Sequence, residues 1–220
     1  MQLSLREVGL AYGERRIFSD IAFDLETGSR ALLLGPSGSG KSSLLNIICG
    51  LQTPDQGTVT LGGEAITGNG DAIRREHMGI VFQTLRLVSA LSLKSNLFLA
   101  QRLQRGRKDP ALVDQTLEQL GLTELANARP FELSQGEAQR AAIARAVVVK
   151  PAILIADEPT SALDHANTQS VAQLLIDMAQ DAGASLLIAT HDERLTGTFE
   201  RTLTLDDGRL HDSALEASAA

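Results

Sequence analysis

One short glycine-rich segment of the 220-residue chain carries the strongest chemical signal. Residues 35–42 match the pattern G-x-x-x-x-G-K-[ST] at every fixed position. Gly38 and Gly40 let backbone N–H groups approach an anion closely, which a β-carbon would prevent. Lys41 brings a positive charge to the β and γ phosphates, and the Ser42 hydroxyl is placed for Mg²⁺. The segment therefore predicts a nucleoside triphosphate site. Its predicted contact residues are Gly35, Pro36, Ser37, Gly38, Ser39, Gly40, Lys41, Ser42 and Ser43.

Two adjacent carboxylates are the second chemical feature. Asp157 and Glu158 follow the apolar run at 153–156. A buried parallel strand delivers its carboxyl end to the crevice where α/β proteins bind ligands. Asp157 is suited to holding Mg²⁺, usually through water, and Glu158 to taking a proton from an attacking water. The spacing alone leaves open which carboxylate performs which task.

Apolar runs predict the strands that must position these groups. A continuous run at Ala31–Leu34 precedes the glycine-rich segment and reads as a strand buried on both faces. Similar runs occur at Ala152–Ala156 and Ser185–Ala189, with a helix predicted at about Asn167–Gln180 between them. This order implies a right-handed parallel crossover. The other predicted strands are Leu3–Tyr12, Ile17–Leu25, Gly57–Leu61, Glu64–Thr67, Met78–Phe82 and a closing hairpin within 202–211.

From about Thr84 to Lys150 the pattern turns helical. Leucines and a valine recur at helical spacing across 112–120, and Ser134 is a good N-cap for a helix that ends near Val149. The region has no separate linkers, so we expect a helical subdomain at about 84–150 within a single domain, 1–220. The small, alanine-rich residues at the end predict a flexible tail over 212–220.

Bulk composition restricts the function classes. The chain is 43% hydrophobic and 21% charged, with a formal net charge of −7. This acidity argues against a broad basic face, so no nucleic-acid partner is expected. Cys49 is the single cysteine, which excludes an intramolecular disulfide and a cysteine-rich zinc site. No signal-like segment and no run of about 18 apolar residues is present, so a cytoplasmic protein is expected.

Several further motifs resemble those of the ABC transporter ATPase family. Residues 133–137 read Leu-Ser-Gln-Gly-Glu and resemble the family signature, usually L-S-G-G-Q, and the Gln-Arg and Ala-Arg-Ala motifs follow at 139–140 and 144–146. Residues 157–164 look like the extended Walker B motif and the D-loop. The remaining matches are Gln83 for the Q-loop, His191 for the switch histidine and Tyr12 for the aromatic that stacks on adenine.

The resemblance covers essentially residues 1–211 and implies a fold. We expect an α/β P-loop NTPase of the ABC ATPase type. Its core would be a mixed sheet with a RecA-like parallel part, joined by an N-terminal antiparallel β subdomain and the helical subdomain.

The resemblance also implies partners and roles. Two copies would pack head to tail, with each ATP between one phosphate loop and the opposite signature. The expected catalytic residues are Glu158, His191, Gln83 and Lys41. Glu158 would polarise the attacking water and His191 would contact the γ-phosphate. Gln83 would sense Mg²⁺ and the water while reporting to the helical subdomain. Further nucleotide contacts are expected from Tyr12, Ser134, Gly136, Glu137 and Asp164, and the Mg²⁺ ligands are expected to be Ser42, Gln83 and Asp157.

The signature departs from the usual pattern at two positions. Gln135 replaces the first glycine and Glu137 replaces the glutamine, whereas Gly136 is kept. We expect ATP hydrolysis to persist with an altered rate. A non-hydrolysing cassette is the alternative, and the intact Lys41, Glu158 and His191 argue against it.

The branch of the family is indicated by residues 73–83 and the stretch after them, which resemble macrolide-export and lipoprotein-release cassettes. This implies ATP-driven export, or movement of envelope lipids, lipoproteins or amphiphiles, through a separate membrane permease at the cytoplasmic face of the inner membrane. Cassettes with a similarly short C-terminus also occur as importer ATPases and as regulatory, mechanotransmitting ATPases, and both remain alternatives. Thr84–Gln104 is the predicted coupling surface, although its leucines could instead be core.

Overall fold

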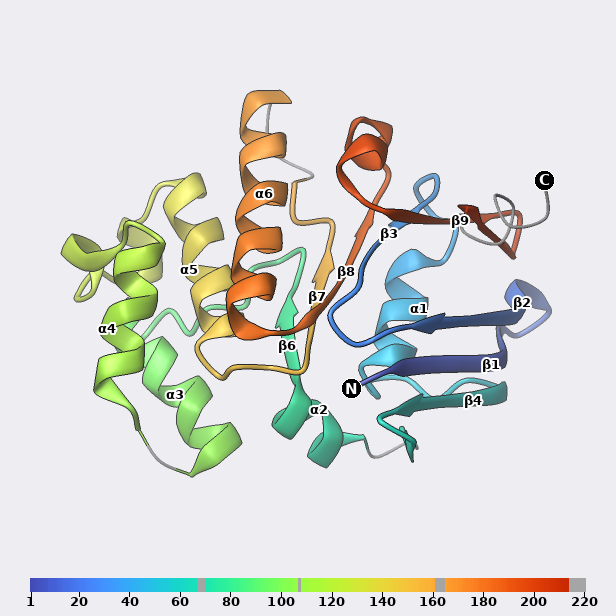
Figure 1. The fold of residues 1–220 in the computed structure, drawn as a ribbon, viewed down its shortest axis with the longest axis horizontal. Helices are drawn as coiled ribbons and strands as arrows, with labels where there is room; N and C mark the ends of the chain where they lie inside the picture. The colour runs from blue at the N-terminus through green and yellow to red at the C-terminus, as the bar shows by residue number, and fades with distance from the viewer. Residues whose placement is uncertain (67–69, 107, 161–164, 214–220) are drawn as a thin grey trace.

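The computed structural model describes residues 1–66, 70–106, 108–160 and 165–213, which form two sheets and a set of helices (Figure 1). The smaller sheet has the strand order β2-β1-β4-β5 and is antiparallel throughout. This confirms the predicted N-terminal antiparallel subdomain. Its strands are β1 (Leu3–Tyr12), β2 (Arg15–Leu25), β4 (Gln56–Leu61) and β5 (Glu64–Ala65).

The larger sheet has the order β10-β9-β3-β8-β7-β6. Its neighbours from β9 to β6 pair in parallel, whereas β10 is antiparallel to β9, so the sheet is mixed as expected. β3 lies inside the sheet beside β8, and β7 lies next to β8. The carboxyl ends of these three strands therefore meet at one edge. The strands are β3 (Arg30–Leu34), β6 (Met78–Val81), β7 (Ile153–Asp157), β8 (Ser185–Thr190), β9 (Arg201–Asp206) and β10 (Arg209–Asp212).

Both faces of the larger sheet are buried, which explains the continuous apolar runs. On β3, Ala31 and Leu33 pack in one core with α1 (Lys41–Ile48) and the smaller sheet, while Leu32 packs in a second core with the helices of the other face. Figure 1 shows α1 between the two sheets, and α5 (Gln135–Val147) and α6 (His165–Ala182) beyond the larger one. Because successive side chains of β3 point to opposite faces of the larger sheet, α1 and α5 pack on opposite sides of that sheet.

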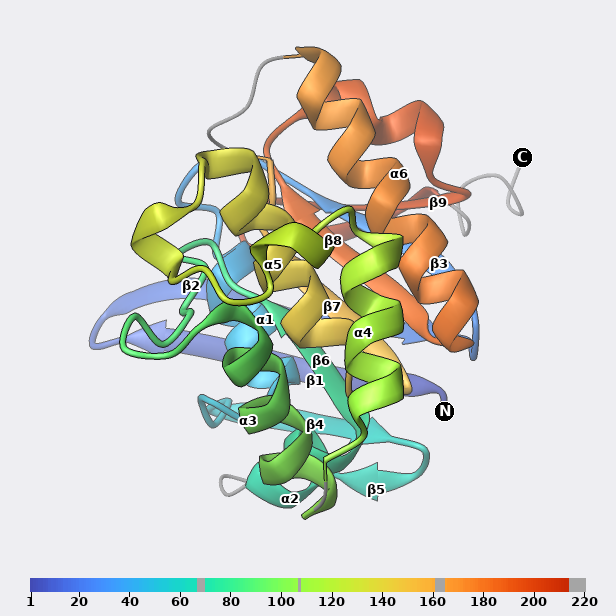
Figure 2. The same ribbon diagram turned by 90° about the vertical axis from the view of Figure 1, so that its left-hand side faces the viewer.

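The main helices of the second core lie on the left-hand side of Figure 1, and this side faces the viewer in Figure 2. Within the described residues, no helix has the length and apolar character needed to cross a membrane. The remaining helices are α2 (Asp71–His77), α3 (Leu93–Arg105), α4 (Pro110–Gln119), η1 (Thr123–Leu125), η2 (Pro130–Glu132), α5 (Gln135–Val147), α6 (His165–Ala182) and η3 (Glu193–Thr198).

The helical region begins later than the sequence pattern predicts. Residues 84–92 contain no helix, and α3 starts at Leu93. Asn96, only 1% exposed, holds this loop: its side-chain oxygen accepts from the Val88 N–H at 2.8 Å, and its amide donates to the carbonyls of Val88, Leu91 and Ser92 at 3.1–3.3 Å. The buried amide takes the place of helical hydrogen bonds for this segment.

Two further elements differ from expectation. The helix α2 leaves no apolar periodicity in the sequence, because it is short and buries none of its residues, and the pattern therefore does not predict it. Asp212, predicted to open the tail, ends β10 and is buried, because its carboxylate accepts from Arg201 Nε at 3.1 Å. Of the rest of the predicted tail, residues 214–220 lie outside the described residues.

Candidate nucleotide-binding site

The glycine-rich loop connects β3 to α1 through backbone that only glycine suits. Gly40 has φ 103°, and a β-carbon there would lie 2.7 Å from Cγ2 of Ile17. A β-carbon on Gly35 would lie 2.3 Å from the carbonyl oxygen of Leu205. The neighbouring strands β2 and β9 therefore hold the loop closely, and its shape is set by tertiary contacts as well as by its own residues.

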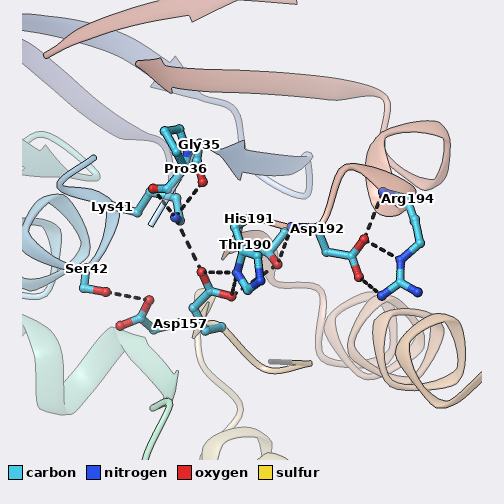
Figure 3. A network of polar contacts seen from close by, with 10 residues as sticks. Gly35, Pro36, Lys41, Ser42, Asp157, Thr190, His191, Asp192 and Arg194 are labelled. Atoms are coloured by element: carbon cyan, nitrogen blue, oxygen red, sulfur yellow. Dashed lines mark hydrogen bonds and ion pairs between the residues drawn. The ribbon is translucent and has the colours of Figure 1, made fainter. Parts of the chain in front are cut away.

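Lys41 turns back into this loop. Its side chain is 5% exposed, and Nζ donates to the carbonyls of Gly35 at 2.8 Å and Pro36 at 3.1 Å (Figure 3). The same Nζ lies 3.4 Å from Oε1 of Glu158. The charge of Lys41 is thus held at the edge where the strands end.

Glu158 follows β7 in a left-handed backbone conformation, with φ 46°. Its N–H donates to the carbonyl of Ala189 at 2.8 Å, which ties the turn to β8. A non-glycine residue at positive φ is strained, and such strain persists where surrounding contacts impose it, often at functional sites. The turn directs the carboxylate back toward the ends of the neighbouring strands.

His191 comes to this carboxylate from the end of β8. Its Nδ1 lies 2.9 Å from Oε2 and 3.0 Å from Oε1 of Glu158, and the Thr190 hydroxyl donates to Oε2 at 3.4 Å. Three segments far apart in the sequence therefore converge on one carboxylate: the loop after β3, the end of β7 and the end of β8 (Figure 3).

Asp157 and Ser42 form a second polar pair. Ser42 Oγ donates to Asp157 Oδ1 at 3.1 Å. Burial raises the pKa of Asp157, and the hydrogen bond from Ser42 opposes that rise. A hydroxyl and a carboxylate oxygen are ligands that Mg²⁺ takes, and a cation between them would offset the cost of burying the carboxylate. The two residues fit a magnesium ion.

Thr190, Asp192 and Arg194 extend the site beyond the sequence prediction. The Asp192 N–H donates to Thr190 Oγ1 at 3.1 Å, and Arg194 Nε donates to Asp192 at 2.7 Å. Arg194 holds the pKa of Asp192 below its usual value. These contacts brace the turn that carries His191. The sequence signal for these three residues is Asp192, which follows His191 directly and is a residue type that often caps the start of a helix. In the structure it caps η3.

Tyr12 and Gln83 lie at the margins of the site. Tyr12 ends β1, is 55% exposed, and accepts at its hydroxyl from Gln52 Nε2 at 2.9 Å. Gln83 is exposed and lies two residues beyond Val81, which pairs with Ala156. Since Glu158 is likewise two residues beyond Ala156, both side chains start from the same edge of the sheet.

A cavity of about 580 Å³ lies beside the loop, between the start of β2 and the turn from β9 to β10. Its walls carry three arginines and two aspartates, and they give an anionic ligand both room and positive charge. The lining residues are Arg15, Arg16, Ile17, Ser19, Pro36, Ser37, Gly38, Ser39, Asp206, Asp207, Gly208 and Arg209.

The signature residues do not join this site within the chain. Ser134 caps α5, and Gly136 lies in its first turn, on the face of the larger sheet opposite α1. Among the described residues, Ser134 and Glu137 bond to each other, and neither forms a hydrogen bond or ion pair with the glycine-rich loop. Asp164, the predicted D-loop residue, lies outside the described residues.

The fold and the site together define a phosphate-loop nucleoside triphosphatase. The loop follows an inner strand of a largely parallel sheet, at the edge where such sheets bind ligands, and a buried lysine and two carboxylates meet there.

Comparison with known proteins identifies the family. Residues 18–161 match the family model described as ABC transporter. An ABC transporter ATP-binding protein of Mycobacterium tuberculosis, Rv0986, is 40% identical over 202 residues, which cover 89% of this chain and 82% of that protein. The lipoprotein-releasing system ATP-binding protein LolD of Pseudomonas syringae is 36% identical over 218 residues, 94% of this chain and 96% of LolD.

Among solved structures, the chain is similar to the ATP-binding cassette MJ0796 in a dimeric, post-hydrolysis state bound to ADP and phosphate. The two structures superpose with a TM-score of 0.85 and are 31% identical in sequence. The match covers 96% of this chain and 97% of that one. The chain therefore belongs to the ABC transporter family. It is an ATP-binding cassette with ATPase activity, which confirms the resemblance seen in its motifs.

Proposed function

We propose that the chain is the ATP-hydrolysing subunit of a transport complex, with Lys41, Glu158 and His191 as its catalytic centre. The observation that carries the proposal is the convergence of a buried lysine and a histidine on one carboxylate, at 3.4 Å and 2.9 Å. A carboxylate placed beside the phosphate loop can take a proton from the water that attacks the γ-phosphate. His191 holds Glu158 and contacts the γ-phosphate.

Lys41 exchanges its partners when ATP binds. Its Nζ is held by two backbone carbonyls and Glu158, all of which the phosphate oxygens replace. The phosphate replaces one carboxylate and two neutral carbonyls, and a contact between two charged groups is stronger than one with a neutral carbonyl, so the exchange favours binding. It also releases Glu158 from the lysine, leaving its carboxylate free to accept a proton.

Ser42 and Asp157 would hold Mg²⁺, and Gln83, two residues beyond β6, would be a further ligand. When bound, the ion neutralises charge on the phosphate oxygens. The support for this role is the Ser42–Asp157 pair and the cost of burying the Asp157 carboxylate.

The nucleoside part of ATP lies toward Tyr12, whose ring is exposed at the end of β1 and stacks on adenine. The amides of the glycine-rich loop and the N-terminus of α1 bind the phosphates. The cavity beside the loop provides the space and the positive charge for this ligand.

A second copy of the chain completes the site. Ser134 and Gly136 of that copy present the N-terminus of α5 to the γ-phosphate, and Asp164 couples the two sites. The support is that Ser134 and Gly136 lie at the start of α5 and make no hydrogen bond to the glycine-rich loop among the described residues, and that the structurally similar cassette MJ0796 is described as dimeric.

A membrane permease docks beside the Q-loop. An apolar groove of about 340 Å³ lies between β6 and α3, and it includes Phe82, Val88 and Leu103, the last 62% exposed. A short amphipathic helix of the permease fits such a groove. The predicted coupling surface is narrower than 84–104, because Leu85 and Leu87 pack against the second core. Docking places the chain at the cytoplasmic face of the inner membrane.

The cargo is an envelope lipid, a lipoprotein or a related amphiphile. The support is the similarity to LolD, which covers 94% of this chain. The permease determines the cargo, because the groove receives a helix and has no contact with the transported molecule.

The substitution Glu158→Gln tests the catalytic proposal. Loss of the base should lower the ATP turnover number about 100-fold or more, while ATP binding is kept. The variant should also form an ATP-dependent dimer that does not dissociate, which size-exclusion chromatography with light scattering measures. Normal turnover by this variant would show that Glu158 is not the base.

A further inference from the structure

The signature serine has both of its hydrogen-bonding functions occupied within its own chain. Ser134 Oγ donates to Glu137 Oε2 at 2.7 Å, and the Glu137 N–H donates to Ser134 Oγ at 3.4 Å. The same carboxylate oxygen accepts from the Ser134 N–H at 2.8 Å. The arrangement is a capping box at the start of α5.

This arrangement conflicts with the role proposed for Ser134. A serine hydroxyl has a single proton, so it cannot donate to the Glu137 carboxylate and to a phosphate oxygen of a partner copy at once. The hydrogen bonds from Ser134 hold the pKa of Glu137 below its usual value, so the carboxylate is charged at neutral pH. A phosphate that reaches Ser134 therefore meets a competing acceptor of the same charge.

We propose that Glu137 is a positioning residue that occupies the Ser134 hydroxyl and repels the partner's γ-phosphate, and thereby raises the ATP concentration needed to close the dimer. The inference rests on the proposed head-to-tail dimer. Glutamine at this position would keep the capping box, because its side-chain oxygen accepts from the Ser134 N–H. It would remove the charge, and its amide would add a donor facing the phosphate.

The test is the substitution Glu137→Gln in the Glu158→Gln background, where hydrolysis does not consume the ATP. Dimer formation is measured by light scattering while ATP is titrated. The half-maximal ATP concentration should fall about fivefold, as expected for removing one like charge near a phosphate at the protein surface. The fall should shrink in high salt, because exposed charges are screened. A purely structural role in capping α5 would not give this salt dependence.

Glu132 supplies a matched control. It lies five residues upstream, and its carboxylate accepts from the Arg129 N–H at 2.5 Å at the start of η2, which is one half of the capping arrangement that Glu137 makes at α5. Glu132→Gln removes the same charge at nearly the same place in the sequence. It should leave the half-maximal ATP concentration within about twofold of the parent value, because an exposed charge that does not face the phosphate contributes little.

The outcomes separate the two proposals. If the Glu158→Gln protein forms no dimer with ATP, the head-to-tail site is wrong, and the inference about Glu137 is wrong with it. If that dimer forms, and the additional substitution Glu137→Gln leaves the half-maximal ATP concentration unchanged, only the inference about Glu137 is overturned. An equal shift in E132Q would also overturn it. In the hydrolysing chain, E137Q should lower KM for ATP by a similar factor with less change in kcat.

Discussion

Lys41 and Glu158 form an ion pair at the base of the site, with Nζ 3.4 Å from Oε1 and both side chains at most 10% exposed. Each charge offsets part of the cost of burying the other. In the mechanism proposed above both groups act in ATP hydrolysis, so the pair holds them in one place until nucleotide binding separates them.

The substitution Lys41→Met should therefore cost stability as well as nucleotide binding. It leaves Glu158 buried without its cation, and removing one partner of a buried pair costs about 3 kcal/mol of the free energy of unfolding. The remaining contact with His191 reduces this cost. Urea unfolding without nucleotide measures it. The double variant K41M/E158Q should recover most of the loss, and failure to recover it would show that the pair does not couple.

The substitution Asp157→Asn should stabilise the nucleotide-free chain at neutral pH. Burial raises the pKa of Asp157 above its ordinary 3.8, so the folded chain binds this proton more tightly than the unfolded chain does. The resulting stability is fully present below pH 3.8 and is lost as pH rises through the raised pKa.

Asparagine mimics the protonated form at every pH. The Tm of D157N should therefore exceed that of the parent by about 2–4 °C at pH 7.5, and the difference should shrink toward pH 4. Mg²⁺ alone should raise the Tm of the parent but not of D157N. A lower Tm for D157N at pH 7.5 would contradict the assignment of burial as the main cause of the shift.

The substitution Gly40→Ala should destabilise the loop through contact with β2. Gly40 and Gly13 both have positive φ, at 103° and 63°, but a β-carbon meets Ile17 at 2.7 Å only at Gly40, and at Gly13 meets nothing within 4 Å. Gly13→Ala should cost about 1 kcal/mol from backbone strain alone. Gly40→Ala should cost clearly more in urea unfolding, and equal costs would mean that Ile17 yields without penalty.

The substitution Leu103→Glu should uncouple the chain from its permease. It places a charge in the apolar groove, so permease binding and permease-stimulated ATPase activity should fall roughly tenfold or more, whereas the basal activity of the isolated chain should stay the same. Gln115→Glu, on an exposed face of α4 outside this groove, adds the same charge as a control. Equal loss in both variants would argue against the groove as the docking site.

The elements that the sequence predicts well are those whose pattern is local. The runs that became β3, β7 and β8 are apolar throughout because both faces of these strands are buried. Prediction failed where one specific side-chain contact decides the structure. Nothing within 84–92 shows that Asn96 will hold this segment as a loop, and nothing within 212–220 shows that Asp212 will pair with Arg201.

The sequence by itself determined the glycine-rich loop, its lysine and the order of the motifs, because these depend on contiguous residues and on backbone conformations that glycine permits. Only the tertiary structure decided which groups touch. The strand order places β8 between β3 and β7, and the left-handed turn at Glu158 directs its carboxylate to Lys41 and His191. Strand pairing joins segments that lie far apart along the chain, and no local pattern encodes such a contact.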